Sequence, residues 1–204
     1  LNTREVNNSI NSAFRSFYYA NPEDSTLYPY AGRVNYLMAQ HYRMVKRDYQ
    51  AGLNHCRLAE KLIQKSPWKD TVLLARCFGV KGLLFKKGVR YSEADSTINK
   101  GLKLLVQLGG NSIFIQEMYR YLIVNAAGRF DILQESKAEA EKLYEKYRAA
   151  LKAHLKKTGQ KEIYVLSDDL KAYYSFFRLE QKAEDCFKAS KGVLKKIHPQ
   201  LPAY

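Results

Sequence analysis

Hydrophobic positions recur at helical spacing along most of the chain, and the clearest example lies between Phe78 and Gly101. Phe78, Gly82 and Phe85 fall on one face of a first helix, and the pattern breaks at Gly88. A second helix follows, and its shared face carries Tyr91, Ala94, Ile98 and Gly101. Large side chains at such positions fill the space between helices, whereas small ones allow two backbones to approach. The stretch therefore predicts two helices folded back on each other.

A related pattern recurs upstream at a constant offset, where Tyr49, Gly52, Cys56 and Ala59 take the places of Tyr91, Ala94, Ile98 and Gly101. Looser matches follow around Phe130 and Ala183. The order of large, small, large, glycine turn, aromatic and alanine resembles the tetratricopeptide repeat, a unit of about 34 residues. The resemblance implies an all-α, right-handed solenoid of antiparallel helix hairpins, here with a somewhat longer repeat.

Prolines and glycines divide the chain into helices with short connections: Pro22, Pro67, Gly128 and Gly159 each end a helical pattern. Individual helices are expected over about 30–46, 50–64, 112–127 and 133–157, and another begins near Trp68. The whole chain, residues 1–204, is expected to form a single domain of about nine helices. Its parts are an N-terminal capping helix at 1–20, helical hairpins at 30–66, 68–109, 111–158 and 161–197, and a tail at 198–204.

The composition is that of an ordered chain, with 46% hydrophobic and 26% charged residues. No run of about 18 apolar residues is present, so the sequence predicts no membrane span. No signal peptide is recognisable, and the chain begins at Leu1 rather than Met. We therefore expect a cytoplasmic protein, or an excised domain whose targeting segment is missing.

The net charge of +14 raises the question of nucleic-acid binding. Basic residues are spread over both halves of the chain, and many have acidic neighbours one helical turn away. Tyrosines recur at core spacing and do not alternate with basic residues along one surface. Solvated helix faces are the first interpretation, a basic groove for an acidic peptide is the second, and nucleic acid is the third.

Residues with catalytic or metal-binding chemistry are few and scattered. The three cysteines, Cys56, Cys77 and Cys186, are expected to be buried free thiols in a reducing compartment. The four histidines show no ligand-like pairing, and no hydrolase, zinc or phosphate-loop motif is present. The sequence therefore predicts a protein that is not an enzyme and has no metal and no cofactor.

The resemblance also implies where a partner would bind. In tetratricopeptide arrays the first helices of successive pairs line a concave face that takes a peptide or a helix. We therefore expect a non-enzymatic scaffold or adaptor that binds a partner, favouring an acidic one, in a mildly basic groove. The partner-binding candidates are His41, Arg43, Arg76, Leu83, Lys86, Lys87 and Arg120.

Two other functions stay open at this point. One is a sensor or regulatory domain of a larger bacterial regulator or sensor kinase that responds to a peptide or small ligand. The weaker one is an RNA-binding helical repeat, whose affinity would fall steeply with salt. In addition, the ends of a solenoid expose core-like surface, so a homodimer through these ends is a further expectation.

Overall fold

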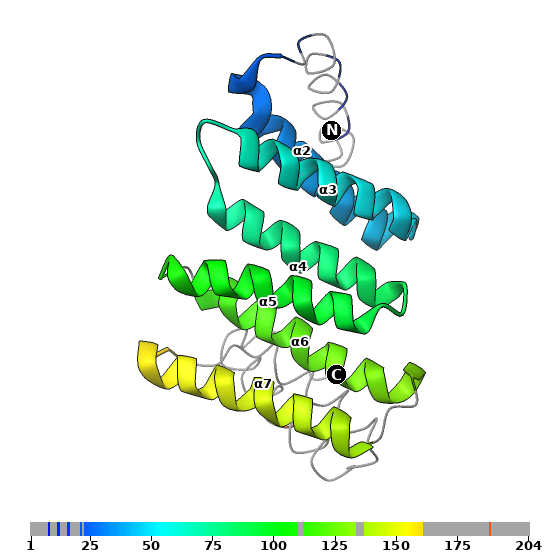
Figure 1. Cartoon of the computed structure of the whole chain (residues 1–204), viewed down its shortest axis with the longest axis vertical. Coiled ribbons are helices and arrows are strands. Elements are labelled where there is room, and N and C mark those ends of the chain that lie inside the picture. Colours follow the sequence, from blue (N-terminus) through cyan, green and yellow to red (C-terminus); the bar gives the residue numbers. More distant parts are fainter. Residues whose placement is uncertain are drawn as a thin grey trace, which may run out of the picture. The chain divides into compact units, whose positions relative to one another are not determined.

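A computed structural model describes residues 21, 23–109, 112–133 and 137–160, together with Asn8, Ser12, Ser16 and Lys188. Over these residues the chain is all-α, without strands, which confirms the all-α part of the predicted fold class. The α-helices are α2 (Tyr28–His41), α3 (Tyr49–Lys65), α4 (Thr71–Lys87), α5 (Tyr91–Gln107), α6 (Ser112–Leu133) and α7 (Lys137–Thr158) (Figure 1). A 3-10 turn, η1 (Ser25–Leu27), precedes α2, and a π-helical turn, η2 (Tyr42–Lys46), follows it.

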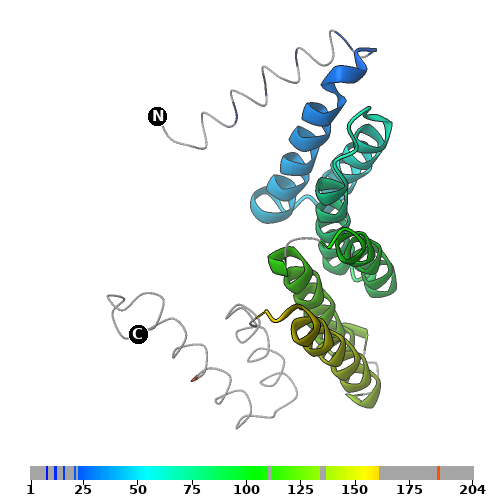
Figure 2. The ribbon, with the colours of Figure 1, turned by 90° about the vertical axis from the view of Figure 1, so that its left-hand side faces the viewer.

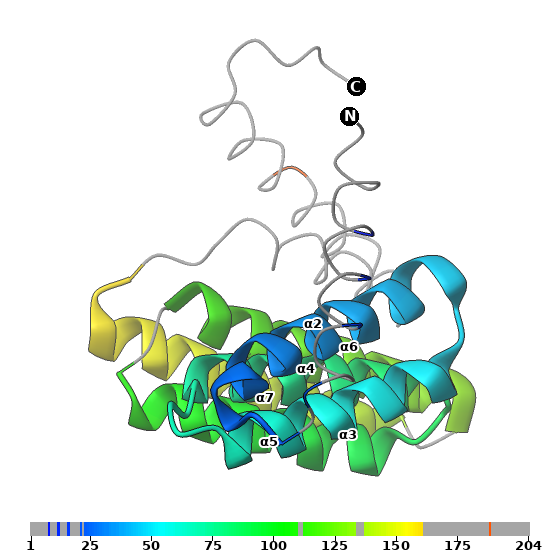
Figure 3. The ribbon, with the colours of Figure 1, turned by 90° about the horizontal axis from the view of Figure 1, so that it is seen from above.

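The chain divides into two compact units, Leu1–Gly109 and Gly110–Tyr204. In the first unit, α2 packs on α3, α3 on α4 and α4 on α5, and α2 also contacts α4. Consequently α2 and α4 lie on one side of this unit, and α3 and α5 lie on the other (Figure 3). In the second unit, α6 and α7 lie side by side (Figure 2). The described helices therefore form three consecutive hairpins.

Small residues allow the helices of the first unit to approach closely. A Cβ atom at Gly82 would lie 2.3 Å from Cγ1 of Ile98, and one at Gly101 would lie 2.7 Å from the carbonyl oxygen of Ala75. Ala94, whose carbonyl oxygen would lie 3.1 Å from the same Cβ atom at Gly82, is fully buried. The predicted pattern of small and large residues in this stretch is thus the packing surface of the α4–α5 hairpin.

The helix ends follow local signals. Asp48 and Asp70 cap α3 and α4 by accepting hydrogen bonds from the backbone N–H groups of Ala51 (3.0 Å) and Leu73 (2.8 Å). Gly109 and Gly159 follow α5 and α7 with positive φ angles of 60° and 66°, the left-handed conformation that glycine adopts without strain. These two predicted stops are confirmed.

Several predicted boundaries are wrong. The helix expected to end at Ala127 continues through Gly128 to Leu133, because a glycine within a helix costs only about 1 kcal/mol and packing along α7 outweighs it. The next helix consequently begins at Lys137. The helix expected to reach Lys46 changes at Tyr42 into η2, and the helix expected near Trp68 begins at Thr71, after its Asp70 cap.

Apart from Asn8, Ser12, Ser16 and Lys188, the helices predicted at 1–20 and within 161–197, and the tail at 198–204, lie outside the described residues. The count of about nine helices and the single domain over residues 1–204 therefore stay predictions. Among the described helices, none combines the length and the apolar character needed to cross a membrane.

Candidate functional site

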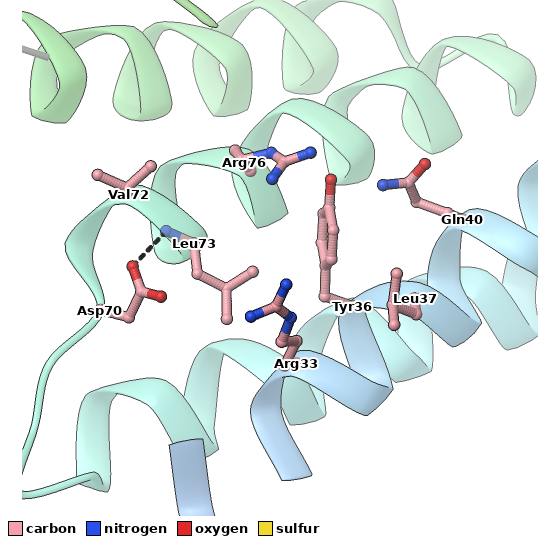
Figure 4. Close-up of a pocket in the computed structure, with 8 residues that line it drawn as sticks. All are labelled: Arg33, Tyr36, Leu37, Gln40, Asp70, Val72, Leu73 and Arg76. Carbon is pink, nitrogen blue, oxygen red and sulfur yellow. Dashed lines mark hydrogen bonds between the residues drawn. The ribbon is translucent and has the colours of Figure 1, made fainter. Parts of the chain in front are cut away.

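The candidate site is a cavity of about 360 Å³ between α2 and α4, which we call the α2–α4 groove (Figure 4). Helical spacing brings its residues together, since positions three and four apart share a helix face. The side chains that line it come from α2 (Arg33, Tyr36, Leu37 and Gln40), from α4 (Val72, Leu73 and Arg76) and from the cap of α4 (Asp70).

Two arginines give the groove its charge. Arg33 is exposed, and the half-buried Arg76 has its guanidinium carbon 5.2 Å from the ring centroid of Tyr36, a cation–π contact. In Figure 4 both guanidinium groups extend from their helices toward the space beside the Tyr36 ring. The carboxylate in the groove, Asp70, accepts the capping hydrogen bond from the backbone of Leu73. The lining therefore has two cations and one carboxylate, and that carboxylate already accepts a hydrogen bond.

Apolar side chains form the remaining surface of the groove. Tyr36 and Leu73 are buried and form its floor, whereas Leu37 is 46% exposed and Val72 is 36% exposed. Exposed apolar residues beside arginines are typical of interfaces in which an apolar contact is surrounded by polar ones. The groove can therefore hold an apolar side chain and, beside it, an acidic group bound by an arginine.

Of the four partner-binding candidates of α4, one lines this groove. Arg76 lines it. Leu83, half-buried, and Lys87, exposed, follow on the same face of α4, because they are two and three helical turns further along. Lys86 is half-buried on the adjoining face.

The candidates outside α4 do not line the groove either. His41 ends α2, with its ring 6.0 Å from that of Tyr42 in an edge-on arrangement, and Arg43 is half-buried in η2. Arg120 belongs to α6 in the second unit, where it is half-buried. Of the eight residues that line the groove, the prediction named only Arg76. Among the seven that it missed are Arg33 and Gln40, which lie one turn on either side of Tyr36 and Leu37. The sequence of α2 does not show that they face α4, because this depends on how α2 is rotated against α3.

Near the end of α2, aromatic and polar contacts hold η2 against α3. The rings of Tyr42 and His55 stack, with centroids 5.3 Å apart and planes at 15°. His55 Nδ1 lies 2.8 Å from Oδ1 of Asn35 and so donates to it, while the Asn35 amide donates to the carbonyl of Ala31. These contacts account for His55 as a structural residue.

The α3–α4 contact contains two buried thiols and an ion pair. Burial raises the pKa of Cys56 to about 12 and raises the pKa of Cys77 as well. Both thiols are free and protonated at neutral pH, as the sequence predicts, and Cys186 lies outside the described residues. Nearby, Lys81 Nζ and Glu60 Oε1 form an ion pair at 2.9 Å between the two helices.

A second cavity, of about 570 Å³, lies in the other unit. Its lining is mostly charged and consists of Arg129, Glu139, Lys142, Leu143 and Lys146. Over the described ranges, no group of three or more His, Cys, Asp or Glu side chains is placed to hold a metal ion.

Fold and groove together define an all-α protein of consecutive helical hairpins. No family model matches the chain, and no curated protein matches it. Among solved structures, the chain is similar to the crystal structure of BtubC (BKLC) from P. vanneervenii, with a TM-score of 0.68 and 20% sequence identity. The similarity covers 99% of this chain and 78% of that chain, and at this identity it concerns the fold alone.

Proposed function

We propose that the chain is a non-enzymatic protein–protein interaction module that binds a peptide or helix of a partner in the α2–α4 groove. The observation that carries this proposal is the lining of the groove, where Arg33 and Arg76 lie beside exposed apolar side chains over a buried floor. Interaction surfaces commonly combine arginine, aromatic and apolar residues in this way.

The architecture supports the same function. The hairpins α2–α3 and α4–α5 pack in sequence, and α2 and α4 are the first helices of their pairs. We propose that they are tetratricopeptide-like repeats of a right-handed solenoid, whose groove side is formed by these first helices. In such an array a rigid scaffold presents the lining residues, so a partner binds to a surface that is already formed.

The charge of the groove indicates the chemistry of the partner. A carboxylate can accept two parallel hydrogen bonds from one guanidinium group, and such pairs are stronger than neutral hydrogen bonds. With Arg33 exposed and Arg76 half-buried, the groove favours a partner with acidic side chains next to apolar ones.

The test is site-specific photo-crosslinking in the organism that encodes the chain. A photoreactive amino acid replaces Leu37 in the groove, and in a matched control it replaces the exposed Lys103 on α5. We expect a crosslinked protein from position 37 that is absent from position 103. The double charge reversal Arg33→Glu/Arg76→Glu should remove this product, whereas Lys100→Glu/Lys103→Glu should leave it.

Other outcomes would contradict the proposal. Equal products from both positions, or none from position 37, would mean that the groove binds no protein. A product sensitive to nuclease would favour the RNA-binding alternative. A small molecule crosslinked at position 37 would favour the sensor or regulatory domain, and a product that contains only this chain would indicate a homodimer.

A further inference from the structure

The exposed side of α2 has the spacing of a helix-binding seam. Tyr30, Arg33, Leu37 and Gln40 follow one another at intervals of three, four and three residues, as do the contact positions of a coiled coil. Tyr30 is 62% exposed and Leu37 is 46% exposed. The seam therefore alternates a large apolar contact with a polar one along one line of the helix.

A second line of residues, on α4, begins in the same groove. Val72 and Arg76 line the cavity, and Leu83 and Lys87 continue the face toward the end of the helix. Val72 and Lys87 are fifteen positions apart, which is about 22 Å along the helix. A partner that follows both lines would therefore need about four helical turns.

The polar groups of the groove decide between a helical and an extended partner. An extended peptide brings one N–H and one C=O group per residue, and these groups need partners when they are buried. Hydrogen-bond donors outnumber acceptors in the lining, because each guanidinium group of Arg33 and Arg76 carries five N–H groups. The acceptors for N–H groups are Gln40, Tyr36 and Asp70, and Asp70 already accepts from Leu73. A helix satisfies its backbone groups internally and needs no such acceptors.

We infer that the partner in the α2–α4 groove is an amphipathic α-helix with acidic side chains, an inference that rests on the proposed function. Its apolar residues contact Leu37 and Val72, and its carboxylates bind Arg33 and Arg76. The charge of the groove favours acidic residues in the partner, and the donor-rich lining favours a partner that satisfies its own backbone groups.

The experiment compares two displayed peptide libraries of about 16 residues, the length that four to five helical turns require. One library draws its random positions from strong helix formers, including Glu, Lys, Leu and Met. The other uses the same mixture with proline at every fourth position, which prevents helix formation. Both are selected on the whole chain, and bound peptides are then measured on the variants Arg33→Glu/Arg76→Glu and Lys100→Glu/Lys103→Glu.

We expect binders from the helix-forming library, with apolar residues three and four positions apart and acidic residues beside them. Their affinity should fall about tenfold or more on the groove variant and stay unchanged on the control variant. A representative peptide should gain helical circular dichroism when it binds. Because Arg76 contacts Tyr36, the single variant Leu37→Glu repeats the test at an exposed position if the double variant does not fold.

The libraries separate the failure of this inference from that of the proposed function. If only the proline library yields binders that depend on the groove, the partner is extended. This result would contradict the inference of a helical partner but would agree with the proposed interaction module. Basic rather than acidic binders would also overturn the inference. If neither library yields a binder that is weakened by the groove variants, both the inference and the proposed function are wrong.

Discussion

The contact between Gly82 of α4 and Ile98 of α5 offers the sharpest test of the packing. A Cβ atom at position 82 would lie 2.3 Å from Cγ1 and 2.9 Å from Cδ1 of Ile98, and 3.1 Å from the carbonyl oxygen of Ala94. Ile98 is fully buried, so its side chain has little room to move away. The variant Gly82→Ala therefore adds one methyl group where none fits.

Two effects of opposite sign determine the result. Alanine in place of glycine stabilises the interior of a helix by about 1 kcal/mol. Overpacking a buried contact destabilises by roughly 1–3 kcal/mol. We expect overpacking to be the larger effect, with Gly82→Ala lowering the free energy of unfolding by about 1 kcal/mol.

The second half of the test removes the Ile98 side chain, which the added methyl group would otherwise meet. Ile98→Ala alone should destabilise by about 3 kcal/mol, as is usual for such a truncation in a core. In that background the methyl group at position 82 no longer meets Ile98, so Gly82→Ala should become stabilising by about 0.5–1 kcal/mol. Urea unfolding of the four proteins, followed by helical circular dichroism, gives the coupling between the two sites, which we expect to be about 2 kcal/mol.

The decisive result is the change in sign of the Gly82→Ala effect on the free energy of unfolding between the two backgrounds. A stabilising Gly82→Ala in the wild-type background, or an equal effect in both backgrounds, would refute the close approach of α4 and α5 at this point. The milder Ile98→Val keeps the cycle measurable if Ile98→Ala unfolds the chain, because it removes only Cδ1 and should relieve the contact in part.

Other predictions concern neighbouring contacts. Gly101→Ala should destabilise more than Gly82→Ala, by about 2–3 kcal/mol in urea unfolding, because its Cβ meets the backbone oxygen of Ala75 at 2.7 Å rather than a side chain. Asp70→Ala should cost about 1 kcal/mol through the lost α4 cap, and Asp70→Asn should restore most of it. In native protein at about pH 8, mass spectrometry should find Cys56 and Cys77 unlabelled by iodoacetamide, and labelling of either one would contradict their burial. Because burial raises the pKa of Cys56 to about 12, its contribution to stability is complete below the unfolded pKa of about 9 and is lost as pH rises toward 12. The alkaline decline in unfolding free energy should therefore be shallower for Cys56→Ala/Cys77→Ala, and equal slopes would contradict the burial of both thiols.

Sequence alone determined the all-α class and the hairpins of the first unit. Periodicity within a helix and the glycines and capping residues at its ends are local signals, which operate within about one turn. For this reason the stops at Gly109 and Gly159 and the packing faces around Gly82 and Ile98 could be predicted without knowing the neighbouring helices.

At two positions the local signals predict the wrong conformation, and the tertiary contacts determine the conformation instead. Gly128 predicts a helix end, but α6 continues through it while packing along α7. At the turn between α4 and α5 the left-handed residue is Val89, with φ of 63°, although Gly88 precedes it with an ordinary φ of −87°. A β-branched residue in this conformation is maintained by the packing of the two helices around it rather than by its own preference.

The lining of the α2–α4 groove also contains one residue that the sequence predicted and others that depend on the tertiary structure. The α4 candidate Arg76 was found from the sequence, because the α4–α5 hairpin carries the clearest repeat pattern. Arg33 and Gln40 were missed in favour of His41 and Arg43, which lie at the end of α2 and in η2. The residues of α2 that face α4 depend on the rotation of α2 about its own axis. That rotation is determined by contacts with α3, such as Gly32 against Ile63, and is therefore a property of the folded hairpin rather than of the α2 sequence alone.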